Sequence, residues 1–240
     1  MRFSPPACWL VALVCCVLAC SEPQVAQVQE AVVAGSAPFA FRAIEDNLRH
    51  DTLLIQTTFD LGDSTFVMVA SHREEKFEGL RLYRYRARAD SSAELIAASS
   101  PAFDSWTMLP TFFPVDTAQP SQAAWVLANF GERESWGQKL FRMSRNFVDM
   151  GFMDVAMPER VEEDGESELK RRNIGPSMRY EERNDTAYFR FACDSVYLYD
   201  DQAGQMDQVL PSRSLHYTYH PGEGLALWLH GEKRLVKKPG

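Results

Sequence analysis

The stretch TAYFRFACDS, residues 186–195, alternates apolar and polar side chains with a period of two. Successive side chains of a β-strand point to opposite faces of a sheet, so this alternation predicts a strand with one buried face. That face carries Ala187, Phe189, Phe191 and Cys193. The opposite face carries Thr186, Tyr188 and Arg190. We therefore expect a strand that contributes aromatic side chains to a core.

Similar strand patterns recur along the chain after Asp51, and turn signals such as Asn184-Asp185 and Pro221-Gly222 separate several of them. The segments predicted as strands are residues 52–60, 65–71, 79–87, 93–98, 105–113, 123–130, 137–143, 147–157, 177–183, 186–193, 195–200, 206–210, 213–220 and 224–230. We expect an all-β fold of antiparallel hairpins in a β-sandwich or a stacked sheet. A small or irregular β-propeller is the alternative.

Three segments depart from this pattern. Residues 39–51 place Phe41, Ile44 and Leu48 at helical spacing, which predicts a short helix. Residues 158–177 carry dense mixed charges that do not suit a core, so we expect a solvated loop or a short exposed helix there. The basic end, residues 232–240, is expected to be a frayed terminus.

An internal similarity links FVMVASHREEKFEGLRLYR, residues 66–84, to WVLANFGERESWGQKLFR, residues 125–142. The alignment pairs Phe77 with Trp136, and a fainter third copy covers residues 188–200. The spacings between copies exceed the roughly 40–50 residues of a typical propeller blade. We therefore interpret the similarity as a repetition of hairpins.

The chain has 240 residues, enough for one domain with a substantial core, and a formal net charge of −8. Nucleic acid is not expected as a partner, because phosphate binding requires a basic surface. Residues 1–19 have the parts of an export signal, with Arg2 as the positive start and an apolar stretch of 12 residues from Cys8 to Ala19. That stretch is shorter than the roughly 20 residues that a membrane-spanning helix needs.

The end of this signal, Val17-Leu18-Ala19-Cys20, resembles the lipobox of bacterial lipoprotein precursors. In that motif an aliphatic residue, a variable small or aliphatic residue and a Gly or Ala precede an invariant Cys. The resemblance covers only this segment, and Leu18 departs from the Ser or Ala commonest at its position. It implies cleavage before Cys20 and attachment of acyl chains to that residue, which would hold the protein on a membrane. Ser21, in place of an Asp that retains some lipoproteins at the inner membrane, favours the outer membrane of a bacterial cell envelope.

The expected organisation is a signal peptide over 1–19, a lipid-anchored flexible tether over 20–37 and a single mostly β domain over 38–240. After cleavage and lipidation, Cys193 would be the only free thiol, so no internal disulfide is expected. Its place on the apolar face of a strand predicts a packing residue rather than a nucleophile.

Chemistry-bearing motifs are scarce. The chain contains none of the GxSxG, HExxH, CxxC, P-loop, GxGxxG or EF-hand patterns, and no cofactor is expected. In SLHYTYHPGEG, residues 214–224, His216 and His220 share one face of a strand. They would lie some 13 Å apart at roughly 3.3 Å per residue, too far to share a metal. Trp125, Trp136 and Trp228 are expected to pack in the core or at a sheet edge rather than to form a sugar-stacking platform.

Three functions remain open. The leading expectation is an envelope lipoprotein with a non-catalytic binding or assembly role, attached to the membrane through lipid on Cys20 and in contact with an envelope protein. The first alternative is a hydrolase with a dispersed site, for which the weak candidates are His72, His216, His220 and the carboxylate of Asp194. The second alternative is a protective protein that neutralises a toxin through its acidic surface.

Overall fold

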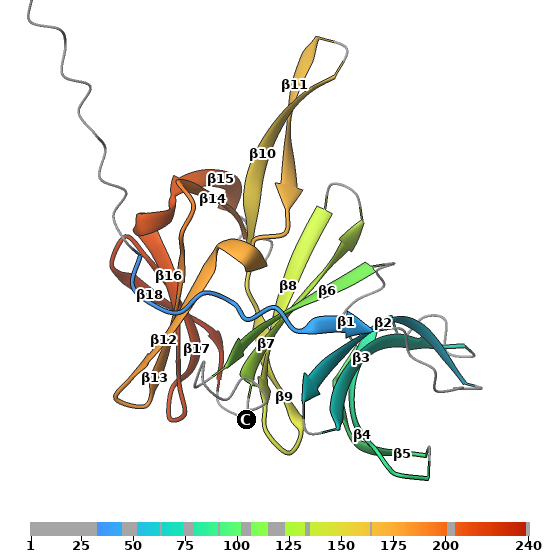
Figure 1. Cartoon of the computed structure of the whole chain (residues 1–240). Helices are drawn as coiled ribbons and strands as arrows, with labels where there is room; N and C mark the ends of the chain where they lie inside the picture. The colour runs from blue at the N-terminus through green and yellow to red at the C-terminus, as the bar shows by residue number, and fades with distance from the viewer. Residues whose placement is uncertain are drawn as a thin grey trace, which may run out of the picture. The chain divides into compact units, whose positions relative to one another are not determined.

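The structure, a computed structural model, is nearly all β (Figure 1). It describes residues 33–44, 52–62, 64–73, 79–90, 92–101, 107–114, 123–132, 135–163, 165–200 and 205–238. Within these residues the strands form four antiparallel sheets, and the helical elements are two short 3₁₀ turns, η2 (Gly175–Ser177) and η3 (Ser212–Ser214). The expectation of an all-β fold is confirmed. The signal segment and the lipobox lie outside the described residues.

The first two sheets are simple meanders in chain order. The first sheet consists of β1 (Arg42–Ile44), β2 (Leu53–Gly62), β3 (Thr65–His72), β4 (Arg81–Ala87) and β5 (Ala93–Ala98). The second sheet consists of β6 (Thr107–Pro114), β7 (Ala123–Glu132), β8 (Ser135–Met143) and β9 (Phe147–Phe152). The similar segments 66–84 and 125–142 are the hairpins β3–β4 and β7–β8, as expected, although Phe77 lies outside the described residues.

The other two sheets interleave along the chain. The third sheet has the order β11-β10-β14-β15, built from β10 (Val155–Glu163), β11 (Glu166–Arg172), β14 (Ser195–Asp200) and β15 (Gln205–Pro211). The fourth has the order β12-β13-β16-β17-β18, built from β12 (Met178–Arg183), β13 (Thr186–Phe191), β16 (Leu215–His220), β17 (Gly224–Leu229) and β18 (Glu232–Lys237). Propeller blades are made of consecutive strands, so these two sheets follow the stacked-sheet expectation rather than the propeller alternative.

Strand β7 is buried on both faces, because the second sheet is the middle layer of the stack. Its side chains Val126 and Ala128 belong to a core shared with the first sheet. Trp125 and Leu127, which point the opposite way, belong to a second core shared with the third and fourth sheets. A strand covered on both sides favours apolar residues at successive positions, which accounts for the unbroken run WVLA at residues 125–128. The next residue, Asn129, is buried but polar, and its amide N–H groups donate to the carbonyl oxygen of Leu109 and to the Thr111 hydroxyl.

The second core is organised around Phe189, which is fully buried. Its ring centroid lies 6.3 Å from that of Phe113, 5.4 Å from that of Trp125 and 5.6 Å from that of Tyr180. Ala187 and Phe191 are buried on the same face of β13, as the alternation predicts. Further along, Cys193 is half-buried, its thiol donates to the carbonyl oxygen of Ser195 at 3.3 Å, and burial raises its pKa.

The turn between β12 and β13 explains the sharp reversal before this strand. Asn184 and Asp185 have φ angles of 50° and 59°, and Arg183 pairs directly with Thr186. Two consecutive residues with positive φ define the type I′ turn that suits the right-handed twist of a hairpin, and Asn and Asp tolerate that conformation well. The turn predicted at these two residues is confirmed.

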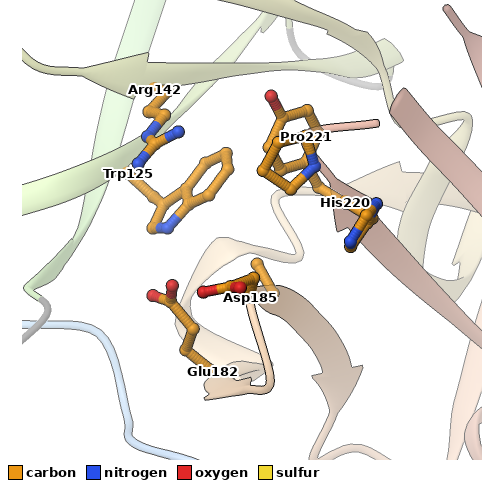
Figure 2. A pocket seen from close by; sticks show the side chains of 8 residues that line it. Trp125, Arg142, Glu182, Asp185, His220 and Pro221 are labelled. Carbon is orange, nitrogen blue, oxygen red and sulfur yellow. The ribbon is translucent and has the colours of Figure 1, made fainter. Parts of the chain in front are cut away.

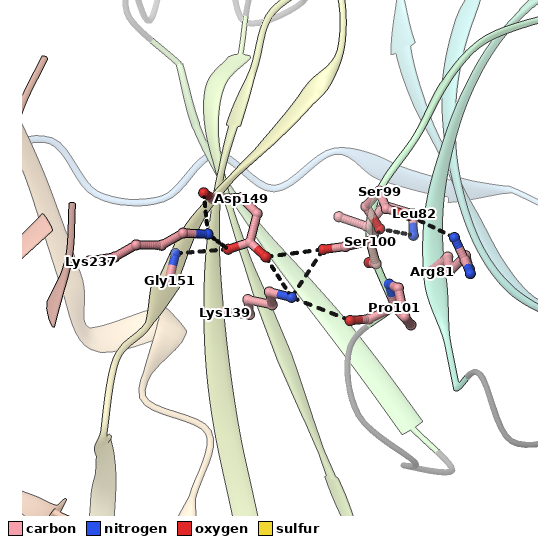
Figure 3. A network of polar contacts seen from close by, with 9 residues as sticks. All are labelled: Arg81, Leu82, Ser99, Ser100, Pro101, Lys139, Asp149, Gly151 and Lys237. Carbon is pink, nitrogen blue, oxygen red and sulfur yellow. Dashed lines mark hydrogen bonds and ion pairs between the residues drawn. The ribbon is translucent and has the colours of Figure 1, made fainter. Parts of the chain in front are cut away.

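Asp149 on β9 anchors a polar network that reaches from the second sheet to its neighbours (Figure 3). Its carboxylate oxygens lie 2.7 Å from Nζ of Lys139 on β8 and 2.9 Å from Nζ of Lys237 on β18 of the fourth sheet. The Ser100 hydroxyl, in the segment after β5, donates to the same carboxylate at 3.2 Å and accepts from Lys139 at 3.0 Å. The side chain of Lys139 is only 8% exposed, so the network satisfies a nearly buried charge.

The expected loop over residues 158–177 is wrong. Most of this segment is the β10–β11 hairpin, followed by η2. Most of the charged side chains stay in solvent, where Glu159 pairs with Arg172 across the strands, although Lys170 is buried. Ile174, by contrast, is fully buried. The backbone ladder satisfies the peptide groups without requiring an apolar face along the whole segment.

The expected helix over residues 39–51 is also wrong in its described part. Arg42–Ile44 forms β1 and pairs with β2, while residues 45–51 lie outside the described residues. The Phe41 ring packs edge-on against Phe112 with centroids 5.0 Å apart. Phe41, which the sequence pattern placed on the apolar face of a helix, therefore packs against a strand of the second sheet. Tertiary packing overrides a weak local propensity here.

Three further boundaries differ from expectation. The basic end is not frayed, because Glu232–Lys237 forms β18 and pairs with β17. The single strand expected over 147–157 is divided into β9 and β10. The faint third copy at 188–200 is not a hairpin, since β13 and β14 belong to different sheets.

The end of the expected tether is also held in place. Ser36 and Tyr180 exchange backbone hydrogen bonds of 2.7 and 3.0 Å. The neighbouring Gly35 has a φ of 121°, and a Cβ at that position would lie 2.9 Å from the Tyr180 carbonyl oxygen. This close approach requires glycine.

Candidate functional site

The structure separates the four weak catalytic candidates. His72 lies at the end of β3 in the first sheet, and Asp194 is exposed in the bend between β13 and β14. His216 and His220 both lie on β16 and line the same pocket of the fourth sheet, so they share a face as predicted. Cys20, the predicted lipidation site, lies outside the described residues.

That pocket, called the aromatic pocket below, has a volume of about 400 Å³. Its floor is made of Tyr188 on β13, His216 on β16 and Trp228 on β17. Its remaining lining residues are Thr186, Thr218, His220, Glu223 and Lys233. The floor comes from the middle strands of a five-stranded sheet, which is a rigid support.

Strand pairing brings the floor rings together. His216 pairs directly with Trp228, and their rings are nearly parallel, with an interplanar angle of 2° and centroids 5.9 Å apart. Tyr188 is a diagonal neighbour of His216, with an interplanar angle of 27° and centroids 6.4 Å apart. The indole N–H of Trp228 donates to the Thr218 hydroxyl at 2.9 Å, which fixes the orientation of the largest ring.

Two cations flank the floor, and each has a carboxylate partner. Nζ of Lys233 lies 5.8 Å from the Trp228 ring centroid and is paired with Glu223. The guanidinium of Arg190 lies 5.0 Å from the Tyr188 ring centroid and is paired with Glu181 at 3.1 Å. These contacts are cation–π interactions whose charges are already compensated.

The protonation states follow from these surroundings. Burial, together with the nearby Arg190, lowers the pKa of His216, so its ring is neutral at neutral pH. The hydrogen bond and the charge of Lys233 lower the pKa of Glu223, so that carboxylate is ionised. The aromatic pocket therefore presents a neutral ring floor beside a compensated ion pair.

A second pocket, of about 320 Å³, contains residues of the second and fourth sheets (Figure 2). The Trp125 indole N–H donates to the Tyr180 hydroxyl at 3.1 Å, and that hydroxyl donates to Glu182 at 2.5 Å. Burial and the bond to Glu182 raise the pKa of Tyr180, so it serves as a neutral donor. The chain of bonds ties the two sheets together.

His220 lines both pockets, with Glu182 and Asp185 in one and Glu223 in the other. Its Nδ1 accepts the backbone N–H of Gly222 at 3.1 Å, a bond internal to its own turn. Neither His216 nor His220 is hydrogen-bonded to a carboxylate of the described residues. In the same part of the chain, no group of three or more His, Cys, Asp or Glu residues is arranged to hold a metal ion.

The tryptophans differ in their roles. Trp125 is a core residue, 3% exposed, as expected. Trp228 is half-buried and lines the aromatic pocket, whereas packing was the role expected for it from the sequence. Tyr188 was placed on the correct face of its strand, but its nearness to His216 and Trp228 depends on strand order, which the alternation of residues does not specify.

No protein-family model, curated protein or solved structure matches this chain. Within the described part of the chain, no helix has the length and apolarity needed to cross a membrane.

Proposed function

We propose that this protein is a lipoprotein of the bacterial cell envelope that binds an envelope component without catalysing a reaction. The lipobox-like segment ending at Cys20 supports the anchor, and Ser21 favours the outer membrane. The single observation that supports binding is that three neighbouring aromatic rings, Tyr188, His216 and Trp228, line the aromatic pocket.

The composition of this floor suits recognition. Trp and Tyr are the residues that binding sites favour, because they offer large rigid surfaces and lose little conformational entropy on binding. The floor is half-buried and is lined by polar groups at its edge, the usual composition of a small-molecule site. Since it is built on paired strands, it needs little reorganisation before a ligand binds.

The anchor predicts a large change in fractionation. Replacing Cys20 by alanine should move the protein from the membrane pellet to the soluble fraction, because the variant lacks the acyl chains. Each methylene of such a chain contributes roughly 0.8 kcal/mol to the free energy of membrane binding. Fractionation of cells after a high-salt wash, followed by mass spectrometry of the N-terminal peptide, measures this. Cys16→Ala is the matched control and should stay in the pellet. A Cys20→Ala protein that remained membrane-bound would contradict the anchor.

Occupancy of the pocket can be tested in intact cells. A photo-crosslinking amino acid at Thr186, on the rim of the aromatic pocket, should yield a recurrent adduct with an envelope component. The same group at Leu95, which is 61% exposed on the first sheet, is the control and should yield none. Mass analysis of the adducts identifies the component, and identical adduct patterns at both positions would contradict a binding role for this pocket.

A further inference from the structure

We propose that the second pocket binds a free amino acid whose carboxylate pairs with Arg142 and whose ammonium group pairs with Glu182 and Asp185 (Figure 2). The proposed function depends on the aromatic pocket, so a site here goes beyond it, although His220 lines both pockets. Three features of the second pocket carry the proposal: charges of both signs at fixed positions, the lack of an ion pair between them, and a volume that suits a small molecule.

Trp125 determines the position of the positive charge. The guanidinium of Arg142 lies 5.8 Å from the centroid of the Trp125 ring, which is a cation–π contact. The indole itself is buried, and its ring centroid lies 5.4 Å from that of Phe189 and 5.2 Å from that of Tyr219. Because these rings hold the indole, the guanidinium rests against a rigid wall of the pocket.

The same tryptophan also determines the position of a negative charge. Its indole N–H donates to the Tyr180 hydroxyl at 3.1 Å, and this hydroxyl donates to the Glu182 carboxylate at 2.5 Å. Asp185 adds a second carboxylate from the turn between β12 and β13. Figure 2 shows both carboxylates on one side of the indole and Arg142 on the other. The pocket is therefore positive at one end and negative at the other.

These charges are left without partners of opposite sign. Among the described residues, none of Arg142, Glu182 and Asp185 forms an ion pair, whereas the adjacent Glu181 pairs with Arg190 at 3.1 Å. All three side chains are exposed, so a dissolved ligand can reach them. A guanidinium offers two parallel N–H donors to a carboxylate, and an ammonium group has three donors, enough for two carboxylates.

Ligands of a single charge fit this pocket less well. An anion on Arg142 would face the carboxylates of Glu182 and Asp185, and a simple cation would leave Arg142 without a partner. In the described part of the chain, no group of three or more His, Cys, Asp or Glu residues is arranged to hold a metal ion. A zwitterion satisfies both signs of charge at once. The volume of about 320 Å³ is at the lower end of the roughly 300–1,000 Å³ of small-molecule sites, which suits an amino acid.

Isothermal titration calorimetry of the purified protein with leucine, serine and glutamine tests the proposal. We expect saturable binding of at least one of them. Its amide lacks the negative charge, and the corresponding acid without the amino group lacks the positive charge. Each analogue should bind at least tenfold more weakly than the amino acid, which corresponds to about 1.4 kcal/mol.

Two variants assign the contacts. Arg142→Gln should weaken binding of the amino acid at least tenfold but leave binding of its amide unchanged, because the amide forms no ion pair with Arg142. Glu182→Gln keeps an oxygen acceptor for the Tyr180 hydroxyl, and it should weaken the amino acid but not the acid without the amino group. The matched control is Arg171→Gln, which removes a guanidinium 4.9 Å from the Tyr199 ring centroid on the third sheet and should leave all binding unchanged.

Several results would overturn the proposal. Equal binding of the amino acid and its amide would remove the role of Arg142, and a variant that weakened the amino acid and its analogues alike would show a structural role only. If none of the three amino acids bound while the Thr186 crosslink persisted in cells, this proposal alone would fail. Loss of that crosslink with amino acid binding retained would contradict only the proposed function.

Discussion

Replacing Phe189 by alanine is expected to lower the free energy of unfolding by about 3–5 kcal/mol, the range for aromatic side chains removed from a core. The ring is fully buried and contacts Phe113, Trp125 and Tyr180. These partners come from the second and fourth sheets, which cannot collapse onto the cavity without moving relative to each other. The lost contacts therefore remain uncompensated.

Urea denaturation of the Cys20→Ala protein measures this change, with circular dichroism as the probe. Leu95→Ala is the matched control, since that side chain is 61% exposed and its loss should change the free energy of unfolding by no more than about 0.5 kcal/mol. A loss below about 1 kcal/mol for Phe189→Ala would show that the two sheets do not share a close-packed core around this ring.

The second large effect is expected at Asp149. Asp149→Asn should lower the free energy of unfolding at pH 7 by about 2–3 kcal/mol, because it leaves the nearly buried Lys139 without its closest carboxylate. The expected loss is below that for a fully buried pair, since the Asp149 side chain is 27% exposed and Lys139 keeps the Ser100 hydroxyl as a partner. The network also connects the second sheet to β18, so the C-terminal strand should loosen.

The pH dependence gives this prediction a specific signature. Burial alone would raise the pKa of Asp149, but the hydrogen bonds and charges of Lys139 and Lys237 outweigh it, and the pKa lies below its ordinary value. A lowered pKa means that the folded state binds the proton more weakly than the unfolded state does. The stabilisation is therefore complete above the unfolded pKa of about 3.9 and is lost as the pH falls through the folded value.

Denaturation curves of the wild-type protein and of Asp149→Asn should therefore converge as the pH falls from 7 toward 3. The matched control is Asp207→Asn, an exposed carboxylate on β15 whose partner is the Tyr197 hydroxyl, and it should change the free energy of unfolding little. A difference between the wild-type protein and Asp149→Asn that stayed constant with pH would show that ionisation of Asp149 does not stabilise the fold.

The local patterns of the sequence predicted most of the strands because one face of each is apolar. In β13, the alternation around Phe189 predicted both the strand and its buried face. The turn at Asn184-Asp185 followed from the tolerance of these residues for positive φ. Both features depend on neighbouring residues only, and local chemistry suffices to predict them.

The wrong predictions concern segments whose structure is determined by contacts with residues distant in the sequence, or by backbone hydrogen bonds between strands without an apolar face. The β10–β11 hairpin exposes charges on its outer part, so it lacks the apolar periodicity that marks a strand. Residues 232–237 form β18 because β17 offers an unpaired edge. The aromatic pocket was missed for a related reason: His216 was noticed, but Trp228 and Tyr188 become its neighbours only through strand pairing.

The middle position of the second sheet has a consequence for the order in which the chain matures. The face of β7 that carries Val126 and Ala128 is covered by the first sheet, which precedes β7 along the chain. The face that carries Trp125 and Leu127 is covered largely by β12 to β17, which follow β7. A chain that emerges from a ribosome or an export channel with its N-terminus first must leave much of the Trp125 side of β7 uncovered until β12 to β17 have appeared. Completion of the native interior is therefore a late, non-local event, and until then the apolar side of β7 is accessible to aggregation or to a chaperone that shields it.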